Sequence, residues 1–113
     1  TILKDMNYAL TSLRKTHPYK KIQIEVDTFS QLNKILQSTT INLDAILLDN
    51  MSIDETKRCI DLIRNKLPLC FIESSGGINL QSISKYRKID VDGISVGALT
   101  HQAVSKNIKF EFE

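Results

Sequence analysis

The feature that most constrains the fold is a regular alternation of apolar strands and amphipathic helical segments. The expected strands end at intervals of roughly 22–24 residues, about the length of one short strand–helix unit. These strand ends are Val26, Leu48, Ile72 and Val96. The run from Ala45 to Leu48 is apolar without alternation, which indicates a strand covered on both faces, as in a parallel sheet. The alternation therefore predicts an α/β fold with a parallel sheet.

Local signals set the expected boundaries of these segments. Ser52 and Glu55 form a capping-box pattern, and Asp27 or Thr28 is a plausible N-cap for the helix before it. The expected helices open near Met6, Phe29, Ile53, Leu80 and Leu99. The expected strands cover Ile22–Val26, Ala45–Leu48, Leu69–Ile72, Gly93–Val96 and Ile108–Phe112.

The length of the chain limits the architecture. Its 113 residues suffice for one domain. About five strands are too few to close a standard eight-stranded barrel of roughly 200–250 residues. A partial parallel β/α barrel leaves two sheet edges with unpaired backbone groups, so more chain or another subunit is expected to complete it. Because the sequence opens with Thr1, we expect either a processed protein or a piece of a longer one.

Composition narrows the class of function. The net charge of +2 gives no strong electrostatic case for binding nucleic acid or an anionic membrane. No apolar run approaches the ~20 residues that span a bilayer, and no signal-peptide pattern opens the chain. Cys59 and Cys70 lack metal-ligand or redox spacing and suit reduced, buried thiols. A cytoplasmic protein is expected.

Polar residues follow the ends of the apolar strands, where parallel α/β folds place their reacting groups. These residues are Lys4, Glu25, Asp27, Asp49, Asn50, Glu73, Ser74, Ser75, Gly97 and His101. Carboxylates suit Mg²⁺, ribose hydroxyls or a developing positive charge. The turns Ser75-Gly76-Gly77 and Gly97-Ala98 suit phosphate, because glycine lets backbone N–H groups approach an anion. Together they predict a site for a phosphorylated sugar with a metal.

Each of these residues also has a purely structural interpretation. Asp49 could cap the turn before Ser52, and Asp27 could cap a helix. Glu73 could accept a hydrogen bond behind the site rather than touch a substrate, and Ser74 and Ser75 could be simple turn residues. Lys4 by itself indicates no particular function, and His101 could lie on a helix surface. Both glycine turns could be ordinary strand–helix turns.

Four ordered motifs resemble those of the quinolinate phosphoribosyltransferase family, also called decarboxylating nicotinate-nucleotide pyrophosphorylases. They are Ile24-Glu25-Val26-Asp27, Leu47-Leu48-Asp49-Asn50-Met51, Glu73-Ser74-Ser75-Gly76-Gly77-Ile78 and Ile94-Ser95-Val96-Gly97-Ala98-Leu99-Thr100-His101. The resemblance covers nearly the whole chain. It implies a barrel enzyme of NAD biosynthesis that joins quinolinate to phosphoribosyl pyrophosphate. The products are nicotinate mononucleotide, carbon dioxide and pyrophosphate, the reaction uses Mg²⁺, and the complete enzyme is a homodimer.

The same resemblance implies roles for individual residues. Lys4 would meet substrate anions, and Glu25 and Asp49 would face the ribose and its metal. Glu73 and Ser74 would support the site without touching the substrate. The phosphate would be held by Ser75, Gly76, Gly77, Gly97 and Ala98, with His101 at the phosphate end.

Two departures from the family pattern leave alternatives open. Lys4-Asp5-Met6-Asn7-Tyr8 stands where the family usually has Lys-Asp-Asn-His-Ile. By this resemblance, the family's Arg- and Lys-rich motifs, which clamp the quinolinate carboxylates, would lie upstream of Thr1. Residues 1–113 are thus expected to be the C-terminal part of one barrel domain, without the N-terminal domain. The alternatives are an inactive remnant that binds phosphate or assists assembly, and a related phosphoribosyltransferase acting on another base.

Overall fold

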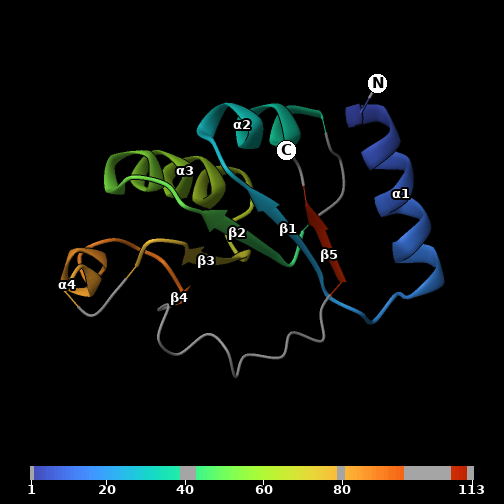
Figure 1. Ribbon diagram of the computed structural model, residues 1–113. Helices are drawn as coiled ribbons and strands as arrows, with labels where there is room; N and C mark the ends of the chain where they lie inside the picture. The colour runs from blue at the N-terminus through green and yellow to red at the C-terminus, as the bar shows by residue number, and fades with distance from the viewer. Residues whose placement is uncertain (1, 39–42, 79–80, 96–107, 112–113) are drawn as a thin grey trace.

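The computed structural model describes residues 2–38, 43–78, 81–95 and 108–111 (Figure 1). Helices in these ranges are α1 (Ile2–Thr16), α2 (Phe29–Ser38), α3 (Ile53–Lys66) and α4 (Ile83–Tyr86). The strands are β1 (Ile22–Val26), β2 (Ala45–Asp49), β3 (Phe71–Ser75), β4 (Gly93–Ile94) and β5 (Ile108–Glu111). They form one sheet in the order β4-β3-β2-β1-β5.

Every strand pair in this sheet is parallel, which confirms the expected α/β fold class. The strand near the end of the chain is also confirmed, as β5. Its neighbour is β1 rather than β4, so the last strand lies beside the first. Sequence order did not predict this pairing, because the position of a strand after a long connection is set by tertiary packing.

The hydrophobic core lies between one face of the sheet and the helices. Figure 1 shows α1, α2 and α3 following one another along one side of the sheet, and neighbouring helices in this series are in contact. Strand residues in the core cluster are Ile22, Ile24, Val26, Ile46, Leu48 and Ile72. Because side chains alternate along a strand, the residues between these positions point to the other face.

The prediction that the strand at residues 45–48 is buried on both sides is confirmed. Ile46 and Leu48 face the helices in the core cluster. Ala45 and Leu47 face the other way, and each is only 7% exposed. β2 is therefore a central strand, flanked by β1 and β3.

The first helix begins earlier than expected. α1 opens at Ile2 rather than near Met6, so Lys4 lies in its first turn and not after a strand. The prediction of a strand end at Lys4 is therefore wrong. Two apolar residues, Ile2 and Leu3, carry no periodicity of their own, whereas Met6 and Leu10 are spaced by one helical turn and are both buried.

Capping interactions fix the starts of α2 and α3. Of the two candidates before α2, Thr28 is the cap: its Oγ1 accepts from the Gln31 N–H at 3.1 Å. Ser52 caps α3 as predicted, accepting from the Glu55 N–H at 3.1 Å. The second half of the predicted capping box differs, because the Glu55 carboxylate accepts from the Phe29 N–H at 2.9 Å. Glu55 thus joins the start of α2 to α3.

Two later boundaries also differ from the predictions. β3 starts at Phe71 rather than Leu69, which is 98% exposed. The helix expected to open at Leu80 begins at Ile83 and has only 4 residues. The expected helix at residues 99–104 lies outside the described residues. None of the helices in the described ranges has the length and apolar character needed to cross a membrane.

Candidate functional site

The sheet face turned away from the helices carries the predicted carboxylates. Leu47 of β2 lies opposite Glu25 on β1 and opposite Glu73 on β3. Asp49 lies two residues beyond Leu47, on the same face, and opposite Ser75. Three neighbouring strands therefore bring Glu25, Asp49 and Glu73 together at their carboxyl ends, which is where such folds place reacting groups.

Asp49 is held by the neighbouring strand. Its Oδ1 accepts a hydrogen bond from Ser75 Oγ at 3.2 Å. The Asn50 N–H donates to the Ser75 carbonyl at 2.7 Å, so the chain after β2 stays against β3. Asn50 adopts a positive φ of 56°, a conformation that asparagine tolerates better than most residues.

The turn after β3 packs directly against Asp49. Gly76 and Gly77 have φ values of +82° and +69°, in the left-handed region that favours glycine. A Cβ on Gly76 would lie 2.9 Å from Asp49 Oδ1 and 2.9 Å from the Asn50 N atom. The predicted phosphate-binding turn and the predicted catalytic carboxylate are thus adjacent, and the close approach requires glycine.

Glu73 and Ser74 point to opposite faces of β3. Glu73 Oε1 accepts from Ser95 Oγ at 2.7 Å, on the face of the carboxylates. Ser74 accepts from the Ser95 N–H through its backbone carbonyl at 2.9 Å. Its side chain is 2% exposed and its Oγ has no hydrogen-bond partner. The structure gives the Ser74 side chain no contact with the site.

The described structure does not test the roles of the remaining predicted site residues. Lys4 lies on α1 and is exposed. Gly97, Ala98 and His101 lie outside the described residues. Contacts of these four residues with a substrate stay predictions.

Glu25 and Asp49 suit a metal ion only in part. In the described ranges no three His, Cys, Asp or Glu side chains gather closely enough to hold an ion. Mg²⁺, however, commonly binds through one or two carboxylates while waters and substrate phosphates fill its other positions. The pair fits an ion shared with a phosphorylated substrate, and it does not fit an all-protein metal cage.

Two further residues contribute to the site: Asn50, which the sequence already placed at a strand end, and Ser95, which sequence reasoning did not single out. Asn50 makes the turn that places Asp49 beside Gly76. Ser95 binds the Glu73 carboxylate. Asn50 carried a signal, an asparagine directly after an apolar strand. Ser95 carried none, since its partner lies on another strand.

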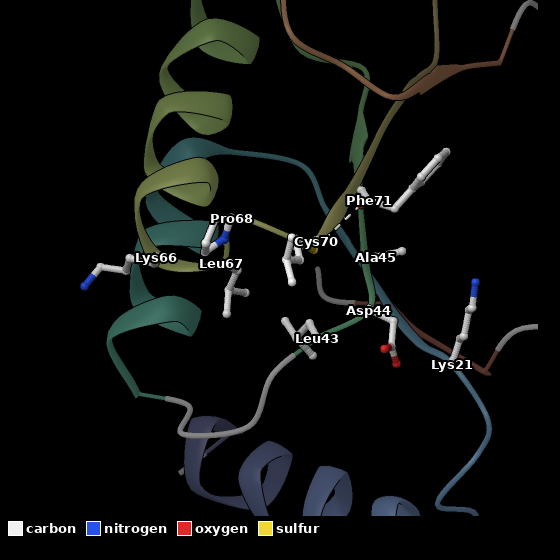
Figure 2. A pocket seen from close by; sticks show the side chains of 10 residues that line it. Lys21, Leu43, Asp44, Ala45, Lys66, Leu67, Pro68, Cys70 and Phe71 are labelled. Atoms are coloured by element: carbon white, nitrogen blue, oxygen red, sulfur yellow. Dashed lines mark hydrogen bonds between the residues drawn. The ribbon is translucent and has the colours of Figure 1, made fainter.

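A hollow of about 740 Å³ lies at the opposite ends of the strands (Figure 2). It is lined by Lys21, Leu43, Asp44, Ala45, Lys66, Leu67, Pro68, Leu69, Cys70 and Phe71. In Figure 2 the side chains of Leu43, Leu67 and Cys70 converge, whereas Lys66 points away. Most of these residues directly precede or begin β2 or β3, and Lys21 directly precedes β1, so this hollow is distinct from the carboxylate face at the other ends of the strands.

Comparison with known proteins gives consistent matches. Residues 1–111 match the family described as "Quinolinate phosphoribosyl transferase, C-terminal domain". A nicotinate-nucleotide pyrophosphorylase [carboxylating] of Mycobacterium leprae is 34% identical over 93 residues, which are 82% of this chain and 32% of that protein. A probable enzyme of the same name from Methanocaldococcus jannaschii is 36% identical over 98 residues, 81% of this chain and 33% of that protein. The chain thus spans about a third of the length of these relatives.

Solved structures match as well. The nicotinate-nucleotide pyrophosphorylase of Francisella tularensis superposes with a TM-score of 0.68 at 30% identity, covering 88% of this chain and 34% of that one. A NadC deletion mutant gives the same TM-score of 0.68 at 32% identity, covering 86% of this chain and 32% of that one. The parallel strands and their helices match the C-terminal portion of that barrel. On the agreement of sequence, fold and matched length, this chain belongs to the quinolinate phosphoribosyl transferase C-terminal domain family.

Proposed function

We propose that this chain supplies the phosphoribosyl-binding part of a site that transfers phosphoribose to quinolinate with decarboxylation. The products are nicotinate mononucleotide, carbon dioxide and pyrophosphate, a step of NAD biosynthesis. The name carried by the relatives describes the same conversion in the opposite direction. In this proposal residues 1–113 form the C-terminal part of one barrel domain, which acts in the cytoplasm. Turnover needs upstream barrel sequence and the homodimer of a complete enzyme.

The observation that carries this proposal is the contact between the Gly76–Gly77 turn and Asp49. Positive φ at both glycines turns the backbone after β3, and no Cβ shields it. Backbone N–H groups of such turns bind phosphate oxygens. A carboxylate placed against this turn would repel a phosphate, unless a cation or a positively charged reaction centre lies between them. Phosphoribosyl transfer provides both, a Mg²⁺ ion and a ribose that gains positive charge as pyrophosphate leaves.

The proposed mechanism assigns the chain binding and electrostatic roles. The phosphate of phosphoribosyl pyrophosphate sits at the glycine turn, with its ribose toward Glu25 and Asp49. The quinolinate nitrogen forms a bond to ribose C1 as the bond from C1 to pyrophosphate breaks. The carboxylates stabilise the positive charge that develops on the ribose, and Ser75 Oγ holds Asp49 in place.

Decarboxylation then needs little from this chain. The bond between a ring carbon and its carboxylate breaks, the electron pair stays on that carbon beside the positively charged ring nitrogen, and the carbon takes up a proton as carbon dioxide leaves. A bound Mg²⁺ would be held by Glu25 and Asp49 and would neutralise the leaving pyrophosphate.

One observation favours a second candidate, a module that binds phosphoribosyl pyrophosphate without turnover. The site face of β1, β2 and β3 carries Gln23, Glu25, Ala45, Leu47, Asp49, Phe71, Glu73 and Ser75. None of these is Arg or Lys, so β1, β2 and β3 offer no cation on this face for the two carboxylates of quinolinate. Another base, or a chain that only binds phosphate, is equally compatible with this face.

Asp49→Asn tests the proposal, because the amide keeps the size and the acceptor oxygen but removes the charge. Calorimetric titration of phosphoribosyl pyrophosphate with Mg²⁺ should show binding to the native chain. In an enzyme completed with upstream sequence, the variant should lower turnover by about 10²–10³ while melting stays within a few degrees. A variant that is destabilised yet fully active would make Asp49 a structural residue. Absence of binding to the native chain would contradict the proposed function itself.

A further inference from the structure

At the base of the sheet, the end away from the carboxylates, two arginines make the same set of contacts. Each arginine lies in the last turn of a helix, Arg14 on α1 and Arg64 on α3. Each binds an aspartate that directly precedes a strand, Asp44 before β2 and Asp92 before β4. We call each set, with the strand amide that the aspartate also binds, a base clamp.

The first base clamp joins α1, β1 and β2. Arg14 donates to Asp44 Oδ2 at 3.0 Å and to the Lys20 carbonyl at 3.2 Å. The same Asp44 oxygen accepts from the Ile22 N–H at 2.7 Å. The Asp44 N–H donates back to the Ile22 carbonyl at 3.0 Å. The aspartate thus pairs with the first residue of β1 through both its backbone and its side chain.

The second base clamp repeats this pattern between α3, β3 and β4. Arg64 donates to Asp92 Oδ2 at 2.8 Å and to the Cys70 carbonyl at 2.9 Å. Asp92 Oδ2 accepts from the Ile72 N–H at 2.8 Å, and the Asp92 N–H donates to the Ile72 carbonyl at 2.8 Å. Arg64 also binds Asp90, with Nε 3.0 Å from Asp90 Oδ2.

The sequence spacing is repeated along with the contacts. Arg14 precedes Asp44 by 30 residues, and Arg64 precedes Asp92 by 28. Ile22 precedes Asp44 by 22 residues, and Ile72 precedes Asp92 by 20. Both arginines bind the carbonyl six residues further on. Four matching hydrogen bonds at matching separations indicate a structural repeat rather than two unrelated surface ion pairs.

Each clamp links the starts of two neighbouring strands, because its aspartate precedes one strand and binds an amide of the other. Asp44 and Cys70, one from each clamp, line the hollow at the base of the sheet (Figure 2). Hydrogen bonds to charged groups are stronger than neutral ones. Partial burial acts to raise the pKa of Asp92. The hydrogen bonds from the Ile72 amide and from Arg64 outweigh this effect and hold the pKa of Asp92 below its usual range.

We propose that the described chain is a tandem of two αβαβ units, α1–β1–α2–β2 and α3–β3–α4–β4, and that each base clamp holds its own strand pair closed independently of the other. The first pair carries Glu25 and Asp49, and the second carries Glu73 and Ser75. Each half of the candidate site is therefore anchored from the base by its own arginine.

Amide hydrogen exchange under native conditions tests this inference, with the Ile22 and Ile72 amides as reporters. Arg14→Met should speed exchange at Ile22 about tenfold and change Ile72 less than about twofold. Arg64→Met should do the reverse. Alkylation of Cys70, followed by mass spectrometry, should also accelerate in Arg64→Met and not in Arg14→Met.

Lys15→Met and Lys66→Met are the matched controls, since these exposed lysines lie in the same helix turns outside the clamps. If a methionine variant folds poorly, Asp44→Asn or Asp92→Asn replaces it in the test. These variants keep an acceptor oxygen for the strand amide and remove only the charge that binds the arginine. Equal acceleration of both amides in every variant would show one cooperative unit and overturn the proposal. Unchanged exchange in all variants would show that the clamps hold nothing, and would overturn it as well.

Discussion

At the scale of single residues, Gly76 is the position where both the fold and the candidate site require the absence of a Cβ atom. Its φ of +82° disfavours every other residue, and a Cβ there would press on Asp49 and Asn50. Ser74, two residues earlier, offers a contrast. Its side chain faces the helices and its buried hydroxyl has no partner, so losing that hydroxyl removes no hydrogen bond.

Gly76→Val should therefore weaken binding of phosphoribosyl pyrophosphate at least about tenfold and lower stability by about 1–3 kcal/mol. Ser74→Ala should leave binding unchanged and keep or slightly raise the free energy of unfolding. Calorimetric titration and urea unfolding of both variants measure the two effects. Equal affinity for the native chain and Gly76→Val would place the anion elsewhere.

At the scale of elements, two side chains of α3 bind the first residue of α2. The Glu55 carboxylate accepts from the first helical amide of α2, and Arg58 of α3 stacks over the Phe29 ring at 4.2 Å. The carboxylate satisfies an N–H group that has no partner within α2 and also lies favourably at the positive end of the helix dipole.

Glu55→Ala should cost about 1 kcal/mol of stability, because it removes a helix cap. Asp54→Ala is the matched control, because Asp54 lies in the same first turn of α3 and is exposed. It should cost less than half as much. The urea midpoints of the two variants measure these losses of stability. Equal losses would show that Glu55 acts only on its own helix.

At the scale of the whole molecule, two buried thiols make stability depend on alkaline pH. Burial raises the pKa of Cys59 to about 12, and burial likewise raises that of Cys70 to about 12. In the unfolded chain a thiol ionises near a pKa of about 8.5. The folded state therefore binds more protons between these values, and stability must fall as pH rises through that window.

The urea midpoint should accordingly be highest below about pH 8 and decline toward pH 10. Replacing both cysteines with alanine should lower the midpoint near neutral pH and flatten this decline, since two of the titrating groups are gone. Midpoints measured across the range for both proteins check the expectation. Parallel curves would assign the alkaline loss to other groups.

Local patterns alone determined a large part of this molecule. The strand Ile22–Val26 was predicted to the residue, and the prediction that Ser52 caps the helix α3 is confirmed. Asp49 closing an apolar strand and the Gly76–Gly77 turn were also read from sequence. Each rests on periodicity, capping or turn chemistry among neighbouring residues, which act before any tertiary contact forms.

Tertiary structure decided the pairings between distant residues. It placed β5 beside β1, turned Glu55 toward Phe29, and brought Ser95 to Glu73. It also extended α1 through Lys4 and formed both base clamps. A polar side chain has several possible partners of similar strength, and spacing along the chain does not rank them. The packing of the helices on one sheet face selects among these partners, because it determines which charged groups and amides lie within hydrogen-bond distance.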